Sequence, residues 1–562
     1  MNEQKTMNKA NEWPARRRLL FPYLIFAILA AVSLFGALRI DGRLFFGDDL
    51  NFHLGRIEGL AQSLGQGDWL PKINYFITGG MGYATGIFYP DFFLYPAALL
   101  RIGGLSLVQS YSLYLYLVSL ATFVIAYQSF LQLRPTQRTG ACLFAVVYGL
   151  STYRLTDVLY RAALGEVLAF MVFPLILVGG YQVVCGDQNR WFWLTAGMTG
   201  LFYGHLLSTL IACLFLALFC LRNVGNLIRA PRRLWSLAKA AGCTLLLTMA
   251  GWAPMVEQLV YQKLRVAEEP IFYLSHTAES LEEYWAGAVS NLRYNNLGIW
   301  VFVVLVVSLM LYWRLDTFNR QLAELGTVFL FLATNLFPHH LFDGTFFNVL
   351  QFPWRYFLLV SLCFSWVVAD GLLKLFSKPM YRRSFFLVLS LWLLGSSLQM
   401  QLQMRASDTR LVPYESFEQM SGEYETGSGR EFLPAGMESW MTPTTLISEP
   451  EEAAAVSQMS RENNIFSLSY ETSEPVRLIF PVLLYKGYMV SGTGTYSKVR
   501  NAGTYKGTSM HGFAEVEVNG RGELTLWYQG TWIQKISLGI SLLTGIGLLV
   551  WWRKADFEER LQ

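Results

Sequence analysis

The polar stretch GDDLNFHLGRIE, residues 47–58, gathers three carboxylates, an imidazole and a guanidinium in one short segment. If a helix begins at Asp49, then Asp49, His53 and Arg56 share one stripe, because residues three and four apart are helix neighbours. A carboxylate there could take a proton from a hydroxyl as a general base, and the arginine could bind a phosphate. The alternative is an interfacial helix that Asp48 or Asp49 merely caps.

The composition predicts a polytopic α-helical membrane protein. Of the 562 residues, 53% are hydrophobic and 15% are charged, and many apolar runs approach the ~20 residues that cross a bilayer. The formal net charge of +4 is small, and no nucleic-acid partner is indicated. The six cysteines lie mostly in apolar runs, so neither a disulfide framework nor a CxxC metal site is predicted.

The positions of Lys and Arg predict about twelve crossings with both ends in the cytoplasm. Arg16-Arg17-Arg18 precede the first apolar run, which lacks a small-residue cleavage site and is therefore interpreted as a retained anchor. Residues 191–221 are too long for one span and carry His205 midway, which predicts two short spans that meet there. The predicted parts are a cytoplasmic N-terminus (1–18), a transmembrane domain (19–400) with its first outer loop (39–104), an outer domain (401–532), a final span (533–552) and a cytoplasmic tail (553–562).

The outer domain is predicted to be β-rich. Residues 476–482, 513–518 and 523–528 are strand-like runs, and the turn signal Asn519-Gly520 separates the last two. These strands carry no evident chemistry of their own, so we expect the domain to bind or position an acceptor.

Further ionisable residues lie beside apolar spans on the predicted outer side, where such residues are costly and usually face a cavity or a partner. In residues 153–166, arginines and Glu166 could serve a site or could simply pair with one another. Arg355 stands at the mouth of an apolar span and suits a phosphate, although snorkelling to the interface is the alternative. The supporting polar residues on this side are Glu58, Asp91, Arg154, Glu166 and His205.

Metal dependence stays open at the level of sequence. Asp48 and Asp49 could bind a divalent cation, and His339, His340 and Asp343 form a second candidate group. Adjacent histidines are poorly placed to bind a single ion. No cofactor is firmly indicated.

The sequence contains no P-loop and no Rossmann fingerprint. An enzyme of this kind would need an activated donor that is already in the membrane, and a lipid-phosphate-linked sugar meets that need. One carboxylate could deprotonate an acceptor hydroxyl, and arginines could neutralise the departing lipid phosphate.

Asp-Asp after the first span, followed by His-x-x-Arg-Ile, resembles the first outer loop of type C (GT-C) glycosyltransferases. Together with residues 82–90, 160–166, 204–206, 351–355 and 485–488, it is similar to bacterial multispanning proteins labelled 6-pyruvoyl-tetrahydropterin synthase-related. The label does not indicate pterin chemistry here, because no convincing zinc–histidine constellation is present.

This resemblance implies a membrane glycosyltransferase of the bacterial cytoplasmic membrane. It would move a sugar from a polyprenyl-phosphate-linked donor to a cell-envelope polymer or glycan on the outer face. It places the catalytic carboxylate at Asp48 or Asp49, and we prefer Asp49 because it lies in register with His53 and Arg56. The candidates for binding the donor phosphate are His53, Arg56, Arg161 and Arg355, and Glu166 is a candidate second acid. Two alternatives are a transporter or flippase for a lipid-linked glycan and a non-catalytic envelope assembly protein.

Overall fold

The fold is described from a computed structural model. It covers residues 20–35, 42–268, 270, 272–291, 295–406, 410–420, 426–427, 430–437, 445–462 and 464–561, with side chains up to 554. The predicted cytoplasmic ends, 1–18 and most of 553–562, therefore lie outside the described side chains.

The chain folds into two compact units, each assembled from segments far apart in sequence. The first unit comprises Met1–Leu50, Ser112–Ala241 and Phe272–Ser416, and the second comprises Asn51–Tyr111, Gly242–Ile271 and Phe417–Gln562. The boundary after Leu50 separates the candidate acids from His53 and Arg56. Each unit thus has its own set of predicted polar residues.

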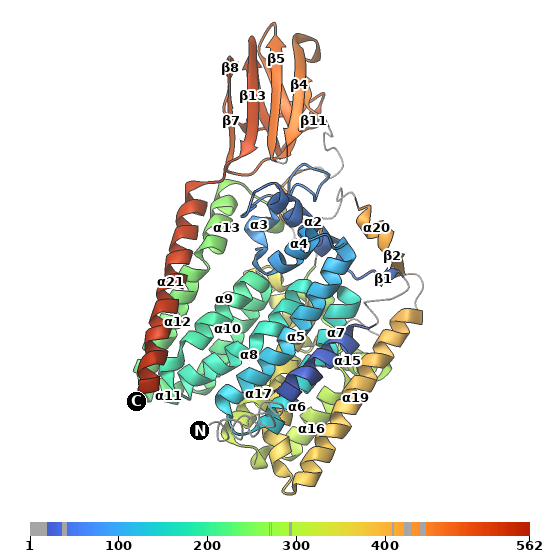
Figure 1. The fold of residues 1–562 in the computed structure, drawn as a ribbon, viewed down its shortest axis with the longest axis vertical. Coiled ribbons are helices and arrows are strands. Elements are labelled where there is room, and N and C mark those ends of the chain that lie inside the picture. The colour runs from blue at the N-terminus through green and yellow to red at the C-terminus, as the bar shows by residue number, and fades with distance from the viewer. Residues whose placement is uncertain are drawn as a thin grey trace, which may run out of the picture. The chain divides into compact units, whose positions relative to one another are not determined.

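The first unit is a helical bundle. Helices α8 (Leu164–Val184), α9 (Phe192–Gly204) and α10 (Leu206–Arg222) pack side by side (Figure 1). Helix α17 (Thr317–Ala333) packs on α18 (Phe357–Trp366). Other helices of this unit include α6 (Arg138–Gly149), α7 (Thr152–Thr156), α15 (Leu281–Ser290), α16 (Ile299–Met310) and α19 (Pro379–Ala406), with most of α5 (Leu107–Leu133).

Five described helices are long and apolar enough to cross a membrane, and bent helix pairs raise this number to seven. The five are Leu107–Leu133, Leu164–Val184, Pro353–Leu375, Pro379–Ala406 and Trp532–Lys554, and the bent pairs are Arg138–Gly149 with Thr152–Arg161 and Arg232–Leu247 with Met249–Tyr261. Four more apolar helices, including Leu20–Leu34 in the predicted first span, are shorter. The predicted count of about twelve crossings is not confirmed.

These long helices differ in how much of their surface packs against protein. In the most apolar 18-residue stretch of α8, 89% is buried inside the protein, whereas in the corresponding stretch of α19 only 28% is buried. A helix that is apolar on all sides and largely buried is a core element. An apolar helix with most of its surface uncovered suits lipid instead.

Two sequence predictions about the bundle can be compared directly with the structure. His205 has an extended backbone between α9 and α10, so the predicted break of residues 191–221 into two helices is confirmed. Helix α19 continues to Ala406, six residues past the predicted end of the transmembrane domain at residue 400, and that predicted boundary stays a prediction. One face of its last turns is buried: Met404 is almost fully covered, and Gln401 donates to the carbonyl of Val32 at 3.0 Å.

The second unit contains two larger antiparallel sheets and the two-stranded pair of β10 (Thr504–Tyr505) with β11 (Thr508–Ser509). The first of the larger sheets has the strand order β3-β6-β12-β8, with β9 also pairing with β12. The second has the order β4-β5-β13-β7, whose strands are labelled in Figure 1. The strands are β3 (Ile447–Glu449), β4 (Ala454–Glu462), β5 (Ile465–Thr472), β6 (Val476–Leu483), β7 (Tyr488–Gly492), β8 (Thr495–Tyr496), β9 (Arg500–Asn501), β12 (Phe513–Asn519) and β13 (Arg521–Tyr528). The predicted strand-rich C-terminal domain is confirmed, and its three predicted strands are β6, β12 and β13. Gly520, with φ +78°, connects β12 to β13 across the two sheets.

The core of the second unit also contains side chains from the first predicted outer loop. Ile77, Tyr83 and Ile87 are buried in the same cluster as Leu478 and Phe480 of β6. The same unit contains α2 (Leu50–Gly65) from residue 51 onward, and α13 (Met249–Tyr261), which packs along α21 (Trp532–Leu561). The first loop and the strand domain therefore share one hydrophobic core.

Candidate active site

The candidate site lies in the first unit, where the chain around Asp49 meets the turn between α7 and α8. This turn contains the π-helical segment η2 (Asp157–Arg161), followed by Ala162 in the left-handed region at φ +51°. Gly47 approaches it so closely that a Cβ there would lie 2.6 Å from Cβ of Ala162. The backbone N–H of Asp49 then donates to the carbonyl of Arg161 at 2.8 Å.

This contact corrects the predicted start of the helix. Helix α2 begins at Leu50, whose N–H closes a turn on the carbonyl of Gly47 at 3.2 Å, while the Asp49 N–H inside this turn is bonded to Arg161. The backbone of Asp49 is thereby anchored to the segment that carries the arginine.

The site contains a buried ionic cluster of Arg161, Asp157, Glu166 and Arg355. Nη1 of Arg161 lies 2.6 Å from Oδ1 of Asp157, and Nη2 lies 2.9 Å from Oε1 of Glu166. The same Glu166 oxygen lies 3.1 Å from Nε of Arg355, and its other oxygen accepts from the hydroxyl of Tyr153 at 2.6 Å. Glu166 thus joins Arg161, five residues before it, to Arg355, 189 residues after it, and charge-assisted bonds of this kind fix the geometry of both arginines.

Besides its ion pair with Glu166, Arg355 makes contacts with the segment just before it. It sits on the 3₁₀ turn η8 (Pro353–Tyr356), where Nη1 donates to the carbonyl of Leu350 at 2.7 Å. Its guanidinium lies 5.1 Å from the ring centroid of Phe352. Nη2 has no hydrogen-bond partner among the residues that the structure describes. One donor of Arg355 is therefore available to a ligand.

The two neighbouring acids have different surroundings. Asp49 is partly buried, and within the described residues its carboxylate makes neither a hydrogen bond nor an ion pair. Burial raises its pKa above the ordinary aspartate value, against the opposing pull of Arg161 and Arg355. Asp48 is exposed and pairs with Nη1 of Arg410 at 3.2 Å. Of the two acids, Asp48 is therefore the one engaged in a surface ion pair.

Two further predicted residues lie inside the bundle. Arg154 is fully buried and donates to the carbonyl of Gly149 and to the hydroxyl of Ser119, each at 2.8 Å. His205 is buried too, with Nδ1 2.7 Å from Oγ of Ser208, and it acts electrostatically on Glu166.

The remaining predicted outer residues belong to the second unit and form a separate network. Arg56 binds Asp91 at 2.8 Å, donates to the carbonyl of Tyr89 at 2.9 Å, and lies over the Tyr89 ring at 3.9 Å. Nη1 of Arg56 lies 3.4 Å from Nδ1 of His53. Burial raises the pKa of Asp91, although Arg56 opposes the shift. Most donors of Arg56 thus serve this network.

Glu58 belongs to the same unit. It pairs with Arg101 at 2.8 Å, and both side chains are partly exposed. This pair lies on the surface of α2 and α4 (Tyr95–Ile102).

The predicted metal candidates are not assembled into a ligand group. Nε2 of His339 lies 3.2 Å from the carbonyl of Thr334, and Asp343 accepts from the backbone N–H of Ser275 at 3.0 Å. His340 is exposed. Across the described ranges, no three His, Cys, Asp or Glu side chains are grouped as metal ligands would be, and this includes Asp48 and Asp49.

Sequence reasoning did not select two members of the cluster, Asp157 and Tyr153. Asp157 stands four residues before Arg161, a spacing that places an acid beside a base on a helix, so a signal for that pair existed. Tyr153 had no such signal, because its bond to Glu166 depends on how α7 turns back against α8.

Together, the fold and the cluster define a helix-rich protein with several membrane-length apolar helices, a buried arginine–carboxylate site and a C-terminal strand domain. No protein-family model matches the chain, and no curated protein matches it. Among solved structures, it is similar to the arabinofuranosyltransferase AftD from Mycobacteria, with 16% identity over 69% of this chain and a TM-score of 0.44. The match spans 27% of the AftD chain. The pterin-synthase-related label gains no support from these comparisons.

Proposed function

We propose that this chain is a membrane glycosyltransferase of the GT-C kind. It moves a sugar from a polyprenyl-phosphate-linked donor to a cell-envelope acceptor on the outer face of the bacterial cytoplasmic membrane. The observation that supports this most is an unpaired carboxylate, Asp49, beside two arginines that a buried glutamate holds in place.

Each group has a role in the proposed transfer. Ionised Asp49 takes the proton of an acceptor hydroxyl, whose oxygen attacks the anomeric carbon of the donor sugar. The bond from that carbon to the phosphate oxygen breaks, and polyprenyl phosphate leaves with the bonding electrons. Nη2 of Arg355 is placed to donate to the departing phosphate, with Arg161 adding positive charge nearby.

In this proposal Glu166 is a positioning residue instead of a second catalytic acid. It accepts from Arg161, Arg355 and Tyr153 at once, which leaves its carboxylate little freedom to transfer a proton. Asp157 and Glu166 balance the charges of the two arginines. Ionised Asp49 is then the one carboxylate of the site whose charge these arginines do not already balance.

The test is transfer of labelled sugar from a panel of polyprenyl-phosphate donors to cell-envelope acceptors. Membranes would contain equal amounts of wild type, Asp49→Asn or Asp48→Asn. We expect transfer by wild type, its loss in Asp49→Asn and its retention in Asp48→Asn, because Asp48 pairs at the surface with Arg410.

Other outcomes would redirect the assignment. Loss of transfer in Asp48→Asn alone would move the base to Asp48. If wild type transferred no sugar from any donor of the panel, the transferase proposal would fail. Movement of a lipid-linked glycan across the bilayer would then be measured, because that is the activity of the transporter alternative.

A further inference from the structure

A basic surface lies in the first unit, on the segment that joins α10 to the first turns of α12 (Arg232–Leu247). This segment contains the short helix α11 (Val224–Arg229). Five Lys and Arg residues lie between positions 222 and 239, and the sequence has no Asp or Glu from 191 to 256. Basic residues beside apolar helices are common in cytoplasmic loops. A ligand site requires, in addition, that the charges are exposed and have suitable neighbours.

Two of the five basic side chains fasten the segment to the bundle. Arg222 forms an ion pair with Glu324 of α17 at 2.7 Å. Arg233 donates to the carbonyl of Val183 in α8 at 2.8 Å. The other three basic side chains are exposed, and they are Arg229, Arg232 and Lys239.

Helix α11 turns apolar side chains outward. Leu227 is its buried side chain, whereas Val224 and Ile228 are exposed, Ile228 to 71%. Asn223, just before the helix, holds this orientation through two amide hydrogen bonds with Gln321 of α17, at 2.8 and 3.3 Å. Exposed apolar side chains beside basic ones are typical of a segment that lies in the interface of a bilayer.

The first turns of α12 carry a basic stripe with an indole at its centre. Arg232, Trp235 and Lys239 share one face of the helix, because they are three and four residues apart. Ser236 and Ala240, on the other face, are buried. Trp235 is 64% exposed, and Nζ of Lys239 lies 5.9 Å from the centroid of its ring. The stripe therefore presents two cations and an aromatic ring to the surroundings.

These groups are located at the ends of apolar helices. Helix α10 is apolar, and α12 begins one of the bent helix pairs that could cross a membrane. A short connector between two such helices lies where the apolar core of a bilayer meets its head groups. Tryptophan is enriched at this level, and long basic side chains extend from it toward the phosphates.

We propose that this surface binds the anionic head group of a membrane phospholipid. The three exposed cations attract the phosphate, and the apolar side chains of α11 and the ring of Trp235 contact the upper part of the acyl chains. Charge complementarity selects an anionic lipid, since the surface is basic and its segment of the sequence contains no acid. The exposed apolar side chains favour a lipid over a soluble anion. This inference goes beyond sugar transfer and needs from the proposed function only that the chain lies in a membrane.

The experiment is photo-crosslinking of the full-length protein in phosphatidylcholine nanodiscs. Each preparation contains a small fraction of a phosphatidylglycerol probe or a phosphatidylcholine probe, with a diazirine near the top of one acyl chain. The measured quantity is the ratio of labelling by the two probes in peptides that cover residues 223–240. We expect wild type to be labelled more strongly there by the phosphatidylglycerol probe.

The variant Arg229→Gln with Arg232→Gln removes two of the exposed charges. A cation near an anionic lipid surface contributes ~1 kcal/mol, so the labelling ratio should fall about thirtyfold. Lysine at both positions should retain most of the preference, because an ammonium group also binds phosphate. The matched control is Lys498→Gln with Arg521→Gln, which removes the same charge from exposed positions of the strand domain. It should leave the ratio unchanged.

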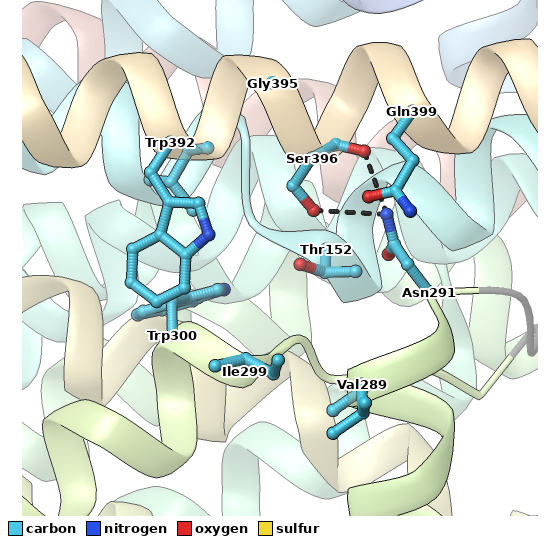
Figure 2. Close-up of a pocket in the computed structure, with 11 residues that line it drawn as sticks. Thr152, Val289, Asn291, Ile299, Trp300, Trp392, Gly395, Ser396 and Gln399 are labelled. Carbon is cyan, nitrogen blue, oxygen red and sulfur yellow. Dashed lines mark hydrogen bonds between the residues drawn. The ribbon is translucent and has the colours of Figure 1, made fainter.

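Trp235→Ala tests the apolar contact. It should lower labelling by both probes and change their ratio little, because the indole carries no charge. The control is Trp392→Ala in α19, since that indole is also exposed but lies beside Trp300 and Ser396 in the wall of a cavity (Figure 2). Labelling of residues 223–240 should then match that of wild type.

Equal labelling by the two probes in wild type would overturn the proposal, because the surface would not select an anionic head group. An unchanged ratio in Arg229→Gln with Arg232→Gln would overturn it too, and these arginines would then only mark the topology. Loss of phosphatidylglycerol labelling in excess soluble glycerol phosphate would overturn the assignment to a lipid in favour of a free phosphate ester. Crosslinking is scored without sugar transfer, so its failure is separable from failure of the transferase proposal.

Discussion

Asp49 is the general base of the proposed reaction, and its surroundings in the fold disfavour its ionised form. Burial raises its pKa, so the ionised form is less favourable in the folded protein than in the unfolded chain. For such an acid the folded state binds the proton more tightly, and stability declines as pH rises from the unfolded pKa through the folded pKa. Asp49→Asn should therefore keep or slightly raise the thermal unfolding temperature at neutral pH while transfer is lost. A marked drop in that temperature would instead assign Asp49 a structural role.

The same shift predicts the pH dependence of transfer. General-base catalysis needs ionised Asp49, so activity should fall on acidification with an apparent pKa above the ordinary aspartate value near 3.9. The measurement is the initial rate of transfer under single-turnover conditions across pH 4 to 8, with protein integrity checked at each pH. A rate that stays constant down to the ordinary aspartate range would contradict the assignment.

Glu166 is the residue on which the ionic cluster depends. Replacing it by Ala leaves Arg161 and Arg355 without their shared acceptor, and breaking a buried ion pair in this way costs about 3–5 kcal/mol. Glu324→Ala is a matched control, because its pair with Arg222 is largely exposed and such pairs contribute less than about 1 kcal/mol. The free energy of unfolding of Glu166→Ala and of Glu324→Ala would be measured in detergent and compared with that of wild type. Equal losses would show that the Glu166 cluster contributes little.

At the scale of elements, the turn at Gly47 packs directly against the turn at Ala162. Gly47→Ala would place a Cβ 2.6 Å from that of Ala162, which must displace the segment that anchors Asp49. We expect a large loss of transfer with a smaller loss of stability. Ala162→Gly removes the opposing Cβ and relieves the left-handed backbone at φ +51°. The double variant should recover part of the activity, and only part, since backbone atoms of 161 and 162 lie within 3.1 Å as well.

If the double variant were no more active than Gly47→Ala, the clash between the new Cβ at position 47 and Cβ of Ala162 would not be the cause of the lost transfer. Gly242→Ala in α12 (Arg232–Leu247) is the control for a glycine substitution, because a Cβ there meets nothing within 4 Å.

Elements with a local signal could be predicted from sequence. The break at His205, the strands β6, β12 and β13 and the long apolar helices all follow from patterns of neighbouring residues. The site depended on non-local contacts. Nothing near Glu166 in sequence indicates that Arg355 binds it, and the approach of Gly47 to Ala162 is a property of the folded backbone. The register of Asp49 with His53 and Arg56 was inferred from a helix that in fact begins at Leu50.

At the scale of the whole molecule, the strand domain and the first loop depend on each other for stability, because they share one hydrophobic core. Ile77, Tyr83 and Ile87 are buried among strand residues, so the loop and the sheets should unfold together. Leu478→Ala removes a fully buried side chain, which costs about 2–5 kcal/mol. Hydrogen exchange should then show faster exchange in residues 73–88 as well as in β12, because both depend on this core.

Met459→Ala is the control, since this apolar side chain of β4 is exposed and its loss should leave both segments protected. If Leu478→Ala raised exchange in β12 and left residues 73–88 unchanged, the loop would have stability of its own. An acceptor bound by the strand domain could then influence the first loop only by direct contact. If both segments respond together, binding to the sheets also stabilises the loop, because a ligand that prefers the folded state stabilises the whole cooperative unit.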